Sequence, residues 1–527
     1  MLITEMLARN ARMYGDEIAL IEREPAKGKR KEISWKTFDD QANKIADALL
    51  RIGVKKGDTV VHLMKNCLEW LPIYFGILRT GASVVPLNFR FDPLAVKRCV
   101  EIADAKAFFL GKEFVEHADI VRNDLKAVTS YVFVGPEETR PNFAESYQAF
   151  LDSGSPVSPQ IQIDLFDNAG LYFTSGTTGN PKAVLLTHRN LEFACYVENS
   201  HHHQTHFDNF LCIPPLYHTG AKIHWFGNLI VGAKAVILKG VEPRWILEAI
   251  SEEKVTIVWL LVPWALDILF AIENQDIHLD EYDLSRWRLM HIGAQPVPPS
   301  LVQEWKKVFP HHQYDTNYGL TECTGPGCVH LGMENMHKVG AIGIPGMDWE
   351  IRIVDSNLNQ APLGEVGELA AKGPGVMKEY FRDPKATEEV LRDGWLLTGD
   401  MARQDEDGFV WLVDRKKDVI ITGGENIFPV EIESFLQAHP RIQDVAVIGL
   451  PNERLGEIPA AVIQIKQGQE LTHEAIDDYC RNLPRYKRPR SVIFAAVPRN
   501  ATGKIEKPML RKLYGGTGRN FPTKVSK

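Results

Sequence analysis

The chain has 527 residues, of which 44% are hydrophobic and 24% are charged. These fractions are typical of globular proteins, so they exclude a disordered, collagen-like or disulfide-scaffold protein. The formal net charge is −8, which argues against a general nucleic-acid-binding protein. A single hydrophobic core does not usually serve a chain of this length, so we expect two or more domains.

The seven cysteines are scattered along the chain, and no CxxC pair occurs. This pattern favours free thiols in a reducing compartment and predicts a cytoplasmic protein. Residues 1–9 contain Glu5 and lack a long apolar core, so they do not resemble a signal peptide. The most apolar run, 258–272, is shorter than the roughly 20 residues of a spanning helix. We therefore expect a soluble protein without a stable membrane anchor.

Helix and strand patterns alternate through the first 150 residues. The spacing of apolar residues predicts a helix over 38–52, and the run 58–63 predicts a short buried strand. An apolar helix is expected at 70–79 and another strand at 82–86. Strand, helix and strand at this spacing indicate a parallel sheet, because parallel strands need a crossover connection. The first part of the chain is therefore predicted to be an α/β layered subdomain.

The same alternation returns further along and predicts a second α/β subdomain, with helices after Gly220 and Pro263. Its expected strands are 210–213, 235–238, 256–261 and 289–292. After Lys338 the pattern changes to short strands separated by Gly, Pro and Asp turns, which indicates a small β-rich subdomain. Its expected strands are 350–354, 367–371 and 409–413.

The last part of the chain is predicted to be a small α+β domain with its own alternation of strands and helices. Its expected helices are 429–438 and 472–482, and its expected strands are 445–448 and 460–465. A basic stretch precedes it, and the final residues are polar and rich in glycine. The predicted division is an N-terminal domain at 1–414, a hinge at 415–417, a C-terminal domain at 418–514 and a flexible tail at 515–527.

The strongest chemical signal is the segment YFTSGTTGNPKAV at 172–184. Glycines let backbone N–H groups approach an anion, hydroxyls donate to phosphate oxygens, and a lysine adds positive charge. The residues that supply these groups are Thr174, Ser175, Gly176, Thr177, Thr178, Gly179 and Lys182. The spacing differs from the GxxxxGK[ST] phosphate loop. A plain polar surface loop is the alternative, and the Pro181–Lys182 pair that follows argues against it.

Seven further motifs follow in a fixed order. They are PLYH at 215–218, GAQP at 293–296, NYGLTE at 317–322, GWLLTGD at 394–400, DRKKD at 414–418, GGEN at 423–426 and PRNATGK at 498–504. Together with the hydroxyl-rich loop they resemble the adenylate-forming superfamily, which contains acyl-CoA synthetases, aryl-CoA ligases, luciferases and the adenylation domains of peptide synthetases. The acyl- and aryl-CoA ligases look most similar.

The resemblance implies an enzyme that works in two half-reactions with ATP, Mg²⁺ and CoA. A carboxylic acid attacks the α-phosphate of ATP and releases pyrophosphate, and the thiol of CoA then displaces AMP from the acyl-adenylate. No protein nucleophile is required, so the cysteines need no catalytic role. In this superfamily the small C-terminal domain is mobile and rotates between the two halves, and Lys417 matches the hinge position.

The resemblance also assigns residues to the nucleotide. The implied ATP- or AMP-binding residues are Thr174, Ser175, Gly176, Thr177, Thr178, Gly179, Lys182, Gly293, Ala294, Gln295, Asn317, Tyr318, Gly319, Leu320, Thr321, Asp400, Arg415 and Lys504. The implied catalytic residues are Lys504, Thr174, Glu322 and His218. Glu322 is a hard oxygen ligand that suits Mg²⁺. Lys504 can bridge the acyl carboxylate and the α-phosphate, and its acetylation would block adenylation by removing the charge.

For the acid, the resemblance implies a pocket lined by His218, Gly220, His224 and Trp225. Two imidazoles and an indole fill space, which favours a compact alicyclic, aromatic or short- to medium-chain acid over a long fatty acid. Lys222 is the only basic residue nearby, and its helical spacing directs it elsewhere. The resemblance places Gly423 and Gly424 at a narrow tunnel for the pantetheine arm of CoA, where only glycine permits close backbone approach.

Two alternatives remain at this stage. A stand-alone adenylating enzyme that loads a carrier-protein thiol fits the same motifs, and a nucleotide-binding protein without catalysis is disfavoured by the intact motif residues. The sequence leaves open the identity of the acid and the choice between a monomer and a homodimer. The run His201–His203 with His206 is interpreted as a solvent-facing helix end or turn, because no carboxylate is recognised at a helical offset.

Overall fold

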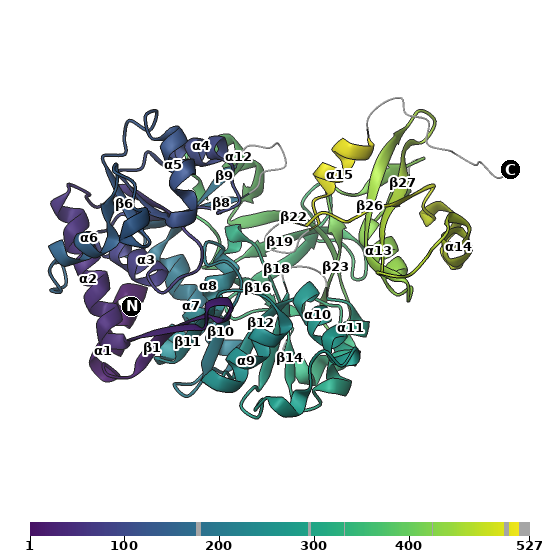
Figure 1. The fold of residues 1–527 in the computed structure, drawn as a ribbon. Coiled ribbons are helices and arrows are strands. Elements are labelled where there is room, and N and C mark those ends of the chain that lie inside the picture. Colours follow the sequence, from purple (N-terminus) through teal and green to yellow (C-terminus); the bar gives the residue numbers. More distant parts are fainter. Residues whose placement is uncertain (175–180, 294–296, 331, 424, 500–504, 516–527) are drawn as a thin grey trace.

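A computed structural model describes residues 1–174, 181–293, 297–330, 332–423, 425–499 and 505–515 (Figure 1). Its described residues form two α/β subdomains, a β-rich part and a C-terminal part that stands apart from the rest (Figure 1). This confirms the predicted fold class.

The first α/β subdomain contains an eight-stranded sheet in the order β20-β9-β8-β4-β3-β5-β6-β7. These strands are β3 (Thr59–Leu63), β4 (Ser83–Pro86), β5 (Ala107–Gly111), β6 (Ser130–Val134), β7 (Glu145–Ser146), β8 (Asn168–Thr174), β9 (Lys182–Thr187) and β20 (Glu379–Tyr380). Its helices are α2 (Trp35–Arg51), α3 (Trp70–Arg79), α4 (Pro93–Ala103), α5 (Val115–Val121), α6 (Tyr147–Ser153) and α12 (Pro384–Val390). The predicted strands at 58–63 and 82–86, the helix at 70–79 between them and the helix at 38–52 before them are confirmed, and β3 pairs with β4 in parallel.

The second subdomain contains a seven-stranded sheet in the order β14-β13-β12-β10-β11-β1-β2. Its strands are β1 (Ile18–Glu24), β2 (Lys29–Ser34), β10 (Asn209–Cys212), β11 (Lys234–Leu238), β12 (Ile257–Leu261), β13 (Leu289–Gly293) and β14 (Gln313–Asp315). The four strands predicted here are confirmed, and they pair in parallel. The hairpin β1–β2 was not expected in this sheet, and it reaches across from the N-terminus to pair with β11.

Two helices lie between the subdomains, α7 (His188–His202) and α8 (Thr219–Val231) (Figure 1). Together with α1 (Ile3–Met13), they pack in one core that holds residues of both sheets, such as Val184 and Phe210. The other face of the second sheet is covered by α9 (Pro243–Glu253), α10 (Val262–Glu273) and α11 (Pro299–Val308), with a core that includes Leu260 and Met290. Alternate residues of a strand therefore point into two different cores.

The β-rich part contains two sheets. One is made of β18 (Glu350–Val354), β19 (Gly367–Lys372), β21 (Leu391–Arg392), β22 (Trp395–Gln404) and β23 (Val410–Arg415), and the other of β15 (Asn317–Gly319), β16 (Pro326–Val329) and β17 (Ile344–Pro345). Both are antiparallel. The expected strands at 350–354, 367–371 and 409–413 are thereby confirmed.

The C-terminal part has its own sheet and its own core, the latter around Ile432 and Val447. Its strands are β24 (Ile420–Thr422), β25 (Glu425–Ile427), β26 (Ile442–Asn452), β27 (Gly456–Ile465) and β28 (Ser491–Phe494), and its helices are α13 (Pro429–Gln437), α14 (His473–Tyr479) and α15 (Lys507–Tyr514). In Figure 1 it meets the rest of the molecule near β22 and β23. The backbone N–H of Val430 donates to Oδ2 of Asp414 at 2.9 Å and ties the two parts together.

All seven cysteines are free, as the sequence predicts. None of the helices in the described ranges combines the length and the apolar character that crossing a membrane requires.

Candidate active site

Three of the motif residues meet around one carboxylate. The hydroxyl of Tyr318 donates to Oδ2 of Asp400 at 2.5 Å, and Nε of Arg415 lies 2.9 Å from Oδ1 of the same group. Asp400 and Tyr318 are buried, while the side chain of Arg415 is 41% exposed. The Asp400 carboxylate raises the pKa of Arg415, and burial together with Asp400 raises the pKa of Tyr318 well above its usual value. The tyrosine therefore remains a hydrogen-bond donor at neutral pH.

The local fold explains why Asp400 reaches this place. Asp400 pairs in register with Arg415 across β22 and β23, which brings the two side chains to one face. Gly399 precedes it with a φ of +74°, a left-handed conformation that side chains rarely adopt. The backbone N–H of Gly399 donates to Glu368 at 3.0 Å, and Glu368 also pairs with Lys416 at 2.8 Å. Glu368 thus holds the turn in the GWLLTGD motif through the backbone of Gly399 and the side chain of Lys416.

The NYGLTE motif also contributes Glu322. Its Oε1 accepts a hydrogen bond of 2.9 Å from the hydroxyl of Tyr380, which sequence reasoning missed. Nζ of Lys182 lies 4.5 Å from the centre of the Tyr380 ring, and Lys182 pairs in register with Thr174. Both ends of the hydroxyl-rich loop are therefore beside Glu322.

A cavity of about 180 Å³ opens between these groups. It is lined by Leu320, Glu322, Glu368, Tyr380, Glu389, Val390, Leu396, Leu397, Thr398, Gly399 and Lys416. A larger hollow of about 530 Å³ lies elsewhere, lined in part by Asp208, Thr256 and Arg288 at the beginnings of β10, β12 and β13. Parallel sheets bind ligands at the carboxyl ends of their strands, so the smaller cavity beside the motifs is the relevant one.

The surroundings of Glu322 suit a residue that binds Mg²⁺. The Tyr380 hydroxyl holds one carboxylate oxygen, the residue is half-buried, and the other oxygen is left for a hard cation. Mg²⁺ usually binds through one or two carboxylates together with substrate phosphates, and a carboxylate with one free oxygen beside the segment that follows Thr174 fits that role.

The predicted acyl-pocket residues come from the start of α8. His218 is the N-cap residue of this helix and is half-buried. At Gly220, a Cβ atom would lie 3.2 Å from the ring of Trp259, so the indole lies close against the helix backbone. The ring of His224, one turn further on, lies 4.7 Å from that of Trp259. Gly220 and His224 therefore share one partner, which the sequence did not single out.

Trp225 does not join them, and the prediction that it faces the acid is corrected. Its indole packs against Phe38 at 6.1 Å and Phe75 at 5.6 Å between ring centres, in the core with α2 and α3. Successive residues of a helix point about 100° apart. Trp225 is therefore directed away from the side on which His224 meets Trp259.

The histidine run at the end of α7 also differs from expectation. His201 and His202 are buried rather than solvent-facing, because α7 is packed between the two subdomains. Glu198 lies one turn earlier at the helical offset that sequence analysis overlooked. Nδ1 of His202 is 2.7 Å from Oε1 of Glu198, and Nε2 is 2.9 Å from Oδ2 of Asp315. Burial opposes the charge, but Glu198 and Asp315 raise the pKa of His202 to about 9.

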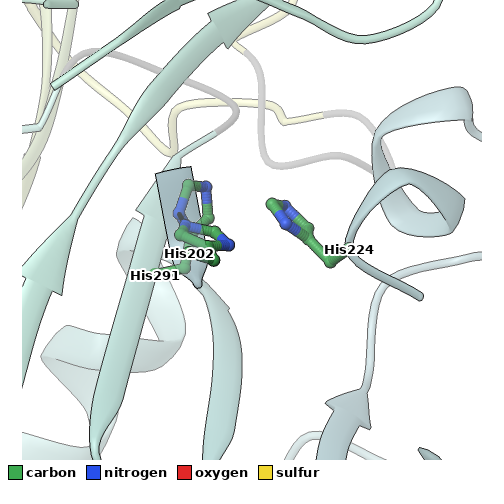
Figure 2. Close-up of side chains that lie close together, drawn as sticks. All are labelled: His202, His224 and His291. Atoms are coloured by element: carbon green, nitrogen blue, oxygen red, sulfur yellow. Dashed lines mark hydrogen bonds between the residues drawn. The ribbon is translucent and has the colours of Figure 1, made fainter. Parts of the chain in front are cut away.

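Figure 2 shows how His224 of α8 faces His202 and His291. The ring of His224 is 4.3 Å from that of His291, and its Nδ1 hydrogen-bonds Glu198. Sets of three side chains here, His202, His224 and His291 or Glu198, His201 and His202, have donor atoms within 4.8 Å of one another. Imidazole and carboxylate donors suit transition metals, so this histidine cluster is the place where the described residues could hold one.

The pairing of parallel strands could have predicted part of this histidine cluster. Trp259 pairs in register with His291, and His291 pairs with Asp315, so the three form one row across β12, β13 and β14. Because parallel strands align their ends, residues at equal offsets share one face.

Lys222, by contrast, is buried elsewhere, with Nζ donating to the carbonyl oxygens of Leu216 and His218 at 2.9 and 3.0 Å. Burial holds the pKa of Lys222 well below its usual value.

The remaining predicted residues either lie elsewhere in the described structure or fall outside the described ranges. Asn317 lies on β15, Thr321 begins a 3₁₀ turn, and a Cβ at Gly319 would lie 2.5 Å from the carbonyl oxygen of Gly325. Gly423 has a φ of +58° and Lys417 is exposed. The predicted residues outside the described ranges are Ser175, Gly176, Thr177, Thr178, Gly179, Ala294, Gln295, Gly424 and Lys504.

Comparison with known proteins identifies the family of the chain that carries this site. Residues 7–381 match the model of the AMP-binding enzyme family, and residues 431–504 match that of the AMP-binding enzyme C-terminal domain. The chain belongs to the AMP-binding enzyme family. The two matches fall on either side of β23, where the C-terminal part begins.

Relatives within the AMP-binding family are acyl- and aryl-CoA ligases. A long-chain-fatty-acid–CoA ligase of Mycobacterium tuberculosis is 32% identical over 483 residues, covering 90% of this chain and 92% of the relative. A feruloyl-CoA synthase of an Amycolatopsis species is 32% identical over 487 residues, covering 92% and 94%. The structure of an anthranilate CoA ligase with anthranoyl-AMP has a TM-score of 0.88 at 25% identity and covers 97% of each chain. This protein is therefore an ATP-dependent, AMP-forming acid–thiol ligase of the acyl-CoA synthetase type.

Proposed function

We propose that this ligase activates a compact alicyclic, aromatic or short- to medium-chain carboxylic acid and transfers it to CoA. The observation that carries the proposal is the joining of Tyr318, Asp400 and Arg415 around one carboxylate, beside the pair of Tyr380 and Glu322. The first three residues suit the adenosine part of a nucleotide, and the pair suits the metal-bound phosphates, so the two groups need to lie next to each other.

In the first half-reaction the protein positions reactants and neutralises charge, because the attacking carboxylate is already ionised. Tyr318 offers its ring to adenine, and Asp400 accepts from the ribose hydroxyls while Arg415 holds it in place. Lys182 and the hydroxyls of the loop from Thr174 would bind the phosphates. Glu322 would bind Mg²⁺, which supplies positive charge to the phosphates when bound. Lys504 would bridge the acid and the α-phosphate.

The substrate class is inferred from the bulk around α8. The ring of Trp259 lies against the backbone at Gly220, and the rings of His224 and His291 lie beside it. Large rings at these positions leave room for a short or ring-shaped acid and obstruct a long chain. The named ligands of the relatives include both fatty and aromatic acids, so the family alone does not choose between them.

We also infer that the residues after Lys417 rotate as a domain between the half-reactions, with residues 415–417 as the hinge. The separate sheet and core of the C-terminal part support this, as does the exposure of Lys417. Rotation would remove Lys504 from the phosphates and bring Gly423 and Gly424 to the pantetheine arm. The same site could load a carrier protein, which the relatives do not favour.

The test is pyrophosphate release with ATP and Mg²⁺ over a panel of acids, with and without CoA. Short, branched, alicyclic, aromatic and long-chain carboxylates should be compared at equal concentration. CoA-dependent turnover of compact acids is the expected result. Turnover of long-chain acids alone would overturn the substrate class, and adenylates that CoA fails to discharge would point to a carrier-protein thiol.

Substitution of Lys504→Ala separates the two halves. Adenylation should be lost while thioester formation from supplied acyl-AMP continues, because the lysine charge is needed only when pyrophosphate leaves. Equal loss in both half-reactions would contradict the two-position scheme.

A further inference from the structure

We propose that the acid carries a neutral hydrogen-bond acceptor, such as a hydroxyl, oxo or ether oxygen, and that Trp259 and His291 recognise it. This inference rests on the proposed function and narrows its substrate class. The two residues are register partners on neighbouring strands, β12 and β13. Both lie on the face of the sheet that α7 and α8 cover, next to Gly220 and His224.

Both side chains carry a buried nitrogen without a hydrogen-bond partner among the described residues. These atoms are Nε1 of Trp259 and Nε2 of His291, on side chains that are 7% and 0% exposed. A buried donor that is left unpaired is destabilising, because it has given up its hydrogen bond to water. Two such donors on one face are therefore expected to have a ligand that pairs with them.

The two nitrogens converge on the space above Gly293. A Cβ atom built on this glycine would lie 3.7 Å from Nε1 of Trp259 and 3.9 Å from Nε2 of His291. Oγ1 of Thr316 also lies 3.9 Å from this position, and because glycine has no side chain, no Cβ atom of residue 293 occupies it. Gly293 ends β13 at the carboxyl edge of the parallel sheet, which is where ligands of α/β proteins bind.

The hydrogen-bond network identifies His291 Nε2 as a donor. The Asp315 carboxylate can only accept, so Nε2 of His202, at 2.9 Å from it, must carry a proton. Nδ1 of His291 lies 3.1 Å from that same nitrogen and must accept, since two protons would otherwise face each other. An imidazole whose Nδ1 accepts a hydrogen bond carries its proton on Nε2. An indole N–H can only donate.

The charges nearby select a neutral acceptor over a second carboxylate. Glu198 and Asp315 are close to His291, and the two ring nitrogens of His202 lie 2.7 and 2.9 Å from their oxygens. Lys222 donates to two backbone carbonyls and faces the ring of Tyr172 at 4.7 Å, so it offers no charge to this space. A buried anion without a paired cation is strongly disfavoured. The acceptor therefore belongs to a part of the acid other than its reacting carboxylate.

Pairs of acids that differ by one oxygen test this inference. Benzoate should be compared with its 3- and 4-hydroxy forms, and cyclohexanecarboxylate with its 4-hydroxy and 4-oxo forms, by kcat/KM for pyrophosphate release. One oxygenated acid should be preferred over its parent by about tenfold or more, since a site built for a hydrogen bond rejects an analogue that lacks it. Trp259→Phe and His291→Phe should each reduce that preference about tenfold, and His291→Gln, which keeps an N–H, should restore part of it.

The control is Trp305→Phe, which removes another buried indole N–H without a described partner, in the core beneath the opposite face of the sheet. It should leave the preference unchanged. Binding of non-hydrolysable acyl-sulfamoyl-adenosines of the same acid pairs, measured by calorimetry, gives a second readout that does not need turnover. Equal kcat/KM and equal affinity within every pair would overturn the inference while leaving the ligase function intact.

Two other outcomes would also overturn it. One equivalent of a bound transition metal that disappears in His291→Phe would show that the imidazole is a metal ligand and not a donor to the acid. Failure of every acid in the full panel, together with no affinity for any acyl-adenylate analogue, would instead contradict the proposed function itself.

Discussion

The hydroxyl of Tyr318 donates to Oδ2 of Asp400 across 82 residues of sequence. This bond and the ion pair with Arg415 leave the carboxylate with a fixed orientation. Tyr318 lies on β15 and Asp400 on β22, so two sheets of the β-rich part are joined at this point. In the proposed function the same two residues bind the two ends of adenosine, and the hydrogen bond sets the distance between them.

Substitution of Tyr318→Phe should weaken ATP binding while leaving the ring in place. A hydrogen bond to a charged group contributes about 1.5–3 kcal/mol, so the KM for ATP should rise about tenfold with a smaller change in kcat. ATP–pyrophosphate exchange at a saturating acid concentration measures both.

Tyr314→Phe is the matched control, because the buried hydroxyl of Tyr314 has no hydrogen-bond partner among the described residues. Its KM for ATP should match that of the wild type. An equal rise in both variants would mean that loss of a tyrosine hydroxyl acts through stability and not through Asp400.

The hydrogen bond from Tyr380 to Glu322 leads to a second prediction. Removing a hydrogen-bond partner of a metal ligand typically lowers metal affinity by 10–100-fold. Tyr380→Phe should therefore raise the free Mg²⁺ concentration needed for half-maximal adenylation by about tenfold. Tyr131→Phe, which removes another buried and unpartnered hydroxyl, should not. An unchanged Mg²⁺ requirement in Tyr380→Phe would argue against Glu322 as the metal ligand.

Asp414 should make stability depend on pH. Burial raises its pKa to about 6, above the value of about 3.9 in an unfolded chain. The folded state then holds the proton more tightly, so stability falls as pH rises from about 4 to about 6 and does not fall further above that. A shift of this size corresponds to about 3 kcal/mol.

Asp414→Asn should remove this pH dependence. At pH 4 the variant should be slightly less stable than the wild type, because Arg415 and Val430 both donate to the aspartate and asparagine has one oxygen. At pH 8 the order should reverse. Urea unfolding at both pH values measures this, with Asp16→Asn at an exposed site as control. A wild-type profile in Asp414→Asn would refute the assignment.

Local periodicity was enough to predict most helices and strands, because it reports which face of an element is buried. It could not predict that β1 and β2 would pair with β11, since the pairing partner of a strand is set by topology. The burial of His202 was missed for a related reason. A helix that is packed between two subdomains buries polar residues as well as apolar ones. Its pattern of polar and apolar residues therefore resembles that of an exposed helix.

For the candidate site, the motifs pointed to residues that the fold brings into contact, as Tyr318 and Asp400 show. The acid side was less predictable. His224 and Trp225 are neighbours in sequence, yet the ring of His224 contacts Trp259 while that of Trp225 contacts Phe38 and Phe75. Trp259 and His291 belong to no motif, and only the alignment of parallel strands brings them together. Substrate-facing residues of this kind depend on register, which one sequence does not specify.

His202 supports the last prediction. Its pKa of about 9 in the folded state lies above the unfolded value of about 6.5. Its contribution to stability is therefore fully present below about pH 6.5 and disappears as pH rises through about 9, a difference of about 3 kcal/mol. His202→Gln should unfold at lower urea at pH 6, because it leaves Glu198 and Asp315 buried without their cation. Its unfolding free energy should also change less between pH 6 and pH 9 than that of the wild type.

His206→Gln is the appropriate control for this measurement. His206 pairs with Glu17 near the surface, where its side chain is 24% exposed and that of Glu17 is 57% exposed, so solvent screens the interaction. This variant should keep the wild-type pH profile. If His202→Gln kept it as well, then His202 would be neutral in the folded protein, and its raised pKa would be refuted.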